Sequence, residues 1–253
     1  MQDLLTKMRA SVKPVSGFSH FIHLGLNILL PILAYVLVRI DFVSLAILLI
    51  LLAKWRIFAV RPRYWLVNIA SNGIDILVGI SLVLFMSSTS VTWWQLFWMG
   101  LYIAWLVWLK PRSDVLSVSA QAMIGQLLGL SVLYLKFGDA PLATLVFGTW
   151  SVTYLSARHF LSSFEESRTG LLTNIWAYFA ASLAFVLGHW LLFYGSISQI
   201  LIILTTIGYS LAALYYLDAS ERLSATFRRQ ILAIMCAILI IIVVLSDWTG
   251  ATV

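Results

Sequence analysis

Long apolar runs separated by short polar segments make up almost the whole chain. Segmenting the sequence into apolar runs of membrane-spanning length gives nine candidates, because about 20 apolar residues in helical form cross the hydrocarbon core of a bilayer. The predicted helices cover residues 18–39, 42–54, 66–87, 92–109, 115–135, 141–158, 171–193, 196–217 and 229–247. The second run is the shortest and must borrow residues from both flanks. The sequence therefore predicts an all-α, polytopic membrane helix bundle.

Composition supports the membrane class. The 253 residues are 62% hydrophobic and only 10% charged, with a mean hydropathy of +0.98. A soluble domain is about 45–50% apolar and about 25% charged, so this chain has too few charges to cover a water-facing surface. The single cysteine, Cys236, excludes an intramolecular disulfide and a cysteine-based metal cluster.

The positions of the basic residues predict an orientation. All but two of the 16 lysines and arginines fall on one side of the alternating helices, and the exceptions are Arg39 and Lys136. The positive-inside rule then places the N-terminus in the cytoplasm and the C-terminus outside. We expect a short basic cytoplasmic segment (1–17), one transmembrane domain (18–247) and a short extracytoplasmic tail (248–253). Short loops favour the plasma membrane of a bacterium.

Polar residues at membrane depth are the main functional clue. Asn68, Asn72 and Asp75 are spaced by four and three, which places them on one face of the third helix, with Gly79 in line. Asp75 is predicted to lie near the midplane, where an ionised carboxylate costs about 2.5–3.5 kcal/mol on insertion scales. Such a group faces a cavity or a partner, and we favour a functional role for it.

The first helix repeats this pattern with His20, His23 and Asn27. Gln121 and Asn174 extend it, in each case within the cytoplasmic half of an odd-numbered helix. This one-sided distribution predicts a polar pocket open to the cytoplasm. The structural alternative is that these side chains only form hydrogen bonds to neighbouring helices.

Two further segments offer polar chemistry. Arg158, His159, Glu165 and Glu166 invite a headgroup-binding or catalytic interpretation, but we favour an amphipathic loop with paired charges at the headgroup level. No HExxH or other metal-ligand spacing is present, so we expect no metal and no cofactor. The segment "KWRIFAVRPR" is expected to meet anionic lipid headgroups. Its basic residues are Lys54, Arg56, Arg61 and Arg63.

The leading hypothesis from sequence is a carrier of small solutes or ions, with Asp75 as the coupling carboxylate and the faces of Asn68, Asn72, His20, His23 and Asn27 as the polar site. The first alternative is an intramembrane enzyme that acts on lipid-linked substrates at the inner leaflet through Arg158, His159, Glu165 and Glu166. The second is a non-catalytic subunit, either in a homo-oligomer or in a membrane complex. It predicts that Asp75 is paired with a buried donor. Neither nucleic acid binding nor a catalytic residue is indicated by any motif.

Overall fold

The computed structural model describes residues 18–55, 61, 63, 65–164, 166–246 and 248, except for the side chains of 18–20, 23, 66–67 and 69–71. The described residues are 81% helical. The α-helices of the described part are α2 (Phe18–Arg39), α3 (Val43–Ala53), α4 (Trp65–Ser87), α5 (Thr92–Ala104), α6 (Val115–Phe137), α7 (Leu142–Ser162), α8 (Thr169–Leu187), α9 (Gln199–Ala219) and α10 (Ala225–Leu245). A π-helical turn, η3 (Trp105–Leu109), extends α5. Strands β1 (Phe193–Tyr194) and β2 (Ile197–Ser198) form a small antiparallel hairpin before α9.

Each of the nine predicted apolar runs overlaps one α-helix, so the all-helical fold class is confirmed. The largest boundary difference is at the end of the seventh run, predicted at residue 193, because α8 ends at Leu187, before the β-hairpin. Within the part of the chain that the structure describes, four helices are long and apolar enough to cross a membrane: α6, α8, α9 and α10. They support a membrane-embedded protein. The count of nine crossings and the orientation of the termini stay predictions.

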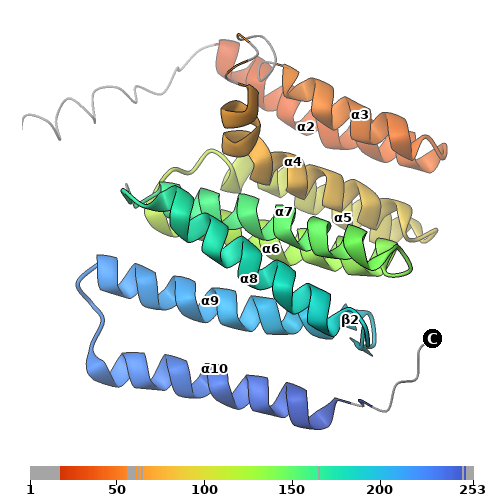
Figure 1. Cartoon of the computed structure of the whole chain (residues 1–253). Coiled ribbons are helices and arrows are strands. Elements are labelled where there is room, and N and C mark those ends of the chain that lie inside the picture. Colours follow the sequence, from red (N-terminus) through yellow and green to blue (C-terminus); the bar gives the residue numbers. More distant parts are fainter. Residues whose placement is uncertain are drawn as a thin grey trace, which may run out of the picture.

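The helices lie roughly parallel to one another and alternate in direction along the chain (Figure 1). One end of the bundle carries Lys54, Lys110 and Arg168 and is called the basic end here. At the opposite end, Arg39 donates hydrogen bonds to Gln95 and Thr92, which ties the end of α2 to the start of α5. The charge asymmetry predicted from sequence is therefore also an asymmetry of the fold.

Two large apolar clusters, joined by α4, form most of the core, and a third, small cluster contains Ala122, Phe160 and Leu161. The first lies among α2, α3, α4 and α5, and the second among α6, α7, α8, α9 and the far end of α10. Close packing of α4 on α6 depends on a Gly-x-x-x-Gly pair, Gly125 and Gly129. A Cβ atom would lie 2.9 Å from Ile74 Cδ1 at Gly125 and 3.0 Å from Leu77 Cδ1 at Gly129. Small residues at this spacing let membrane helices approach closely.

The last helix, α10, packs least. Ile242 is its one buried residue among those described. Its attachment lies at the end opposite the basic end, where Ser246 accepts a 2.6 Å hydrogen bond from Gln199 Nε2 and also bonds the Tyr194 hydroxyl. The remaining length of α10 is largely exposed, as expected for a helix covered by lipid.

Candidate functional sites

Asp75 is held by three donors from two other parts of the fold. Its Oδ2 lies 2.7 Å from Lys54 Nζ and 2.9 Å from Lys110 Nζ, and its Oδ1 accepts a 3.2 Å hydrogen bond from Trp105 Nε1. The side chains of Lys54 and Asp75 are each 15% exposed, and that of Lys110 is 33% exposed. We call Lys54, Asp75 and Lys110 the charge cluster. It lies about 15 Å along α4 from Trp65, at a rise of 1.5 Å per residue.

Local backbone geometry brings these donors together. Lys54 is the C-terminal cap of α3, so its side chain reaches from a helix end towards α4. Lys110 follows η3, and its backbone N–H donates to the carbonyl of Trp105 over 2.8 Å. This i→i+5 bond widens the turn and stacks residues five positions apart. The π-turn thus allows both Trp105 and Lys110 to reach Asp75.

The rest of the predicted polar face of α4 makes local contacts. Asn72 Nδ2 donates to the carbonyl of Asn68 on its own helix over 3.0 Å. Gly79 lies where α4 meets α5 and α3, and a Cβ atom there would be 2.8 Å from the Tyr102 hydroxyl and 3.1 Å from Ile50 Cγ2. The α4 face that carries Asp75 and Gly79 therefore packs against α3 and α5.

Gln121 and His159 form a second polar contact at the basic end. Gln121 Nε2 donates to the carbonyls of Leu109 and Arg112 over 2.8 and 3.0 Å, which satisfies carbonyls at the end of η3. Its Oε1 lies 2.9 Å from His159 Nε2. Gln121 is 5% exposed, so this network joins α6, α7 and the end of α5 inside the bundle.

The other predicted headgroup residues bond to separate parts of the fold. Arg158 Nη1 donates to the Tyr154 hydroxyl on the same helix over 3.1 Å. Glu166 accepts hydrogen bonds from the Tyr215 hydroxyl (2.7 Å) and from the Arg168 backbone N–H (3.2 Å). These bonds, Tyr215 first, hold the pKa of Glu166 below its ordinary value. The structure thus places Arg158, His159 and Glu166 on different partners.

The remaining predicted residues are described only by their exposure or fall outside the described part of the structure. Asn27 is half-buried on α2, and Arg61 and Arg63 are exposed. Residues Glu165 and Arg56 and the side chains of His20 and His23 lie outside the described residues. Among the described residues, no three His, Cys, Asp or Glu side chains are placed to hold a metal ion.

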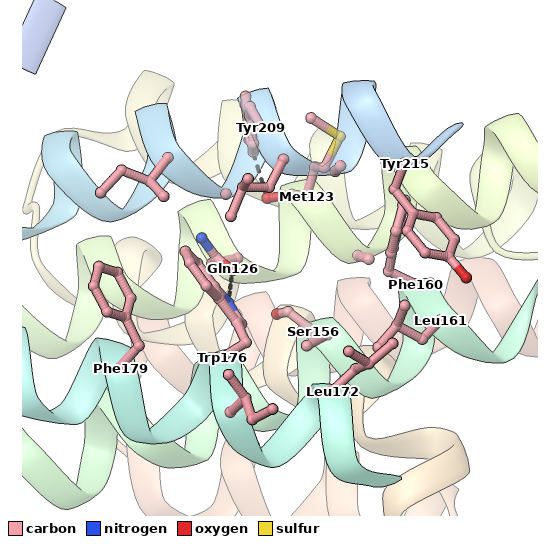
Figure 2. Close-up of a pocket in the computed structure, with 17 residues that line it drawn as sticks. Met123, Gln126, Ser156, Phe160, Leu161, Leu172, Trp176, Phe179, Tyr209 and Tyr215 are labelled. Atoms are coloured by element: carbon pink, nitrogen blue, oxygen red, sulfur yellow. Dashed lines mark hydrogen bonds between the residues drawn. The ribbon is translucent and has the colours of Figure 1, made fainter. Parts of the chain in front are cut away.

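A lateral cavity lies between α6, α7, α8 and α9. Its volume is about 410 Å³, within the range of about 300–1,000 Å³ of small-molecule sites. Figure 2 shows Gln126, Trp176 and Ser156 in its middle, Phe160, Leu161 and Tyr215 towards one end, and Phe179 towards the other. The lining is almost entirely apolar. Its side chains include no Asp, Glu, His, Lys, Arg or Cys among the residues that the structure describes.

The cavity opens sideways between α8 and α9. Ile175 and Phe179 on α8 and Leu211 on α9 line it and are also 56%, 44% and 46% exposed. The three helices α6, α8 and α9 have membrane-spanning length and apolarity. In a bilayer that these helices cross, the opening would face the hydrocarbon and lipid chains would have access to the cavity.

One polar atom of the cavity lacks a partner. Gln126 donates to the carbonyl of Leu204 over 3.3 Å and accepts from Trp176 Nε1 over 3.4 Å, and Tyr209 donates to the carbonyl of Met123. Ser156 is 3% exposed, and its hydroxyl has no hydrogen-bond partner within the described part of the chain. A buried polar group left unpaired costs about 1–3 kcal/mol, so a ligand that bonds to Ser156 would recover this energy.

The cavity was missed by sequence reasoning. The signals available were Gln126 and Ser156, two polar residues in apolar helices, but neither belongs to a spaced polar face. Comparison of the chain with protein-family models, curated proteins and solved structures finds no significant match.

Proposed function

We propose that this membrane protein binds a long-chain membrane amphiphile in the lateral cavity. The hydrocarbon chain of the amphiphile lies along the aromatic and aliphatic lining, and a carbonyl or ester oxygen of the amphiphile accepts a hydrogen bond from the Ser156 hydroxyl. The observation that carries the proposal is the unpaired, buried Ser156 hydroxyl in an otherwise apolar cavity of about 410 Å³. The lateral opening supplies the route of entry.

The lining favours binding over chemistry within the cavity. General acid–base catalysis and nucleophilic catalysis both need a titratable or activated group beside the substrate. Ser156 has no base within hydrogen-bond reach in the described residues, and the other hydroxyls of the cavity belong to tyrosines. The sequence suggested an enzyme for lipid-linked substrates as one alternative. The cavity keeps the lipid as the ligand and serves as a binding site for its hydrocarbon chain.

The test uses the full chain in phosphatidylcholine nanodiscs that contain a phospholipid with a diazirine in mid-chain. After irradiation, mass spectrometry should locate cross-links mainly on Ile175, Trp176 and Leu211. Ala212→Trp fills the cavity and should reduce these cross-links several-fold, because Ala212 lines it. Ala213→Trp is the matched control, since Ala213 is next along α9 and is not a lining residue. Even labelling along exposed α10, with no response to Ala212→Trp, would refute the proposal.

The Ser156 hydrogen bond has its own test. Ser156→Ala should lower lipid retention in native mass spectrometry without lowering the melting temperature, because the hydroxyl has no protein partner to lose. Equal retention by both proteins would remove Ser156 from the site. Cross-links between two chains at α8 and α9 would instead assign the cavity to a second copy.

The ion-coupled carrier is a second candidate, and the observation that favours it is the charge cluster at membrane depth. Asp75 is shared by two ammonium groups, so transport requires it to exchange these partners during the cycle. This proposal takes the chain to cross the membrane nine times, with the basic end in the cytoplasm of a bacterial cell. Asp75→Asn should then abolish coupled uptake in proteoliposomes while the fold is retained.

A further inference from the structure

The charge cluster carries one more positive charge than negative. Lys54 and Lys110 both contact the same oxygen of Asp75, while the other oxygen accepts from the neutral indole of Trp105. Asp114, the next carboxylate along the chain, is exposed and accepts instead from the Ser117 backbone N–H. Within the described residues the second ammonium group therefore has no carboxylate of its own.

The cluster is built to hold two cations close together. Two like charges in a partly buried place repel each other, and their approach needs a shared anion between them. Asp75 supplies that anion, and the helix end at Lys54 and the π-turn before Lys110 fix the two side chains. Each ammonium group has three N–H donors, so the contact with Asp75 leaves donors free for a second anion.

Access comes from the side of Lys110. Its side chain is 33% exposed, against 15% for Lys54, so an anion at the basic end meets Lys110 first. Nearby, Arg112 lies 4.8 Å from the ring centroid of Trp108, which keeps a further positive charge at this end. Oxyanions with several oxygens suit such a site, because one oxygen can bond each ammonium group.

We propose that Lys54 and Lys110 together bind a phosphate group at the basic end, with Asp75 setting the spacing of the two ammonium groups. This proposal is independent of the lateral cavity. It also differs from headgroup contact along "KWRIFAVRPR", because it joins Lys54 to Lys110 across the fold and needs no other residue of that segment. The phosphate belongs either to a lipid headgroup or to a phosphate-bearing solute.

The experiment compares two probes on the full-length protein. In nanodiscs that mix phosphatidylcholine and phosphatidic acid, native mass spectrometry counts retained phosphatidic acid. In pure phosphatidylcholine nanodiscs, the melting temperature is followed against inorganic phosphate, with chloride at equal ionic strength as the reference. Retention of phosphatidic acid alone identifies a lipid headgroup site, and a shift with inorganic phosphate identifies a soluble ligand.

Lys110→Gln should weaken whichever probe binds by about tenfold, because it removes one of the two charged donors of the site. Lys136→Gln is the matched control, because Lys136 is a basic residue near the opposite end. Asp75→Asn should also weaken binding, because it removes the anion that holds the two ammonium groups at this spacing. If that variant does not fold, Lys110→Gln and its control decide alone. Equal binding by both lysine variants, or no binding of either probe to the wild type, would overturn the proposal.

Discussion

Removing the Asp75 carboxylate tests the charge cluster directly. Asp75→Ala leaves two ammonium groups side by side, and breaking a buried ion pair costs about 3–5 kcal/mol. Lys110 is 33% exposed and can turn towards water, so its share is smaller. We therefore expect a loss of about 2–4 kcal/mol, or about 5–15 °C in melting temperature for a chain of this size. Asp139→Ala, at an exposed site near the opposite end, should change little.

A double-mutant cycle makes this prediction sharper. Lys54→Met leaves Asp75 with Lys110 and Trp105, so it should cost less than about 1 kcal/mol. The double variant Asp75→Ala with Lys54→Met should recover most of the stability that Asp75→Ala alone loses. Only the ammonium group of Lys110 is left in the cluster, and it can turn towards water. The assay is thermal and denaturant unfolding of the detergent-solubilised protein. Additive effects, or an Asp75→Ala variant as stable as the wild type, would show that the cluster does not stabilise the fold. The carrier hypothesis would then be favoured, because it requires Asp75 to leave its partners during transport.

Two further predictions concern topology and pH. In a Cys236→Ala background, the Glu221→Cys variant should react with a membrane-impermeant maleimide only from the cytoplasmic side. The Asp139→Cys variant should react only from outside. Labelling of both variants from one side would contradict nine crossings. Because the pKa of Glu166 is lowered, its contact with Tyr215 contributes stability above the ordinary pKa of glutamate and is lost as pH falls through the lowered value. Tyr215→Phe should raise the Glu166 pKa in a ¹³C carboxyl titration, and an unchanged pKa would contradict the contact.

The helices could be predicted from sequence because each depends on a local property. An apolar run of spanning length must satisfy its backbone internally, so each run becomes a helix wherever it packs. Even α3, with 11 residues, forms where the shortest run predicted it. The π-turn at Trp105–Leu109 could not be predicted, because nothing in "WLVWL" distinguishes it from an α-helical segment.

The candidate sites were less predictable, because they depend on tertiary contacts. Spacing alone placed Asn68, Asn72 and Asp75 on one face of α4. The lysine partners of Asp75, Lys54 and Lys110, lie 21 and 35 positions away in sequence. In the sequence these two lysines were used to predict the orientation of the helices. The lateral cavity is still less local, since its lining comes from four helices, α6, α7, α8 and α9.

The one-sided distribution of polar residues can be explained by the reach of side chains at helix ends. Lys54 and Lys110 extend from the ends of α3 and η3, so their shared carboxylate must lie on the same side of the bundle. Gln121 satisfies carbonyls at the end of η3 and is itself bonded to His159. These contacts explain the polar groups near the basic end as helix-packing and helix-end contacts, so their presence does not require a solute path. Ser156 is different, because its buried hydroxyl bonds to no described part of the fold, and a ligand in the lateral cavity is the partner that would explain it.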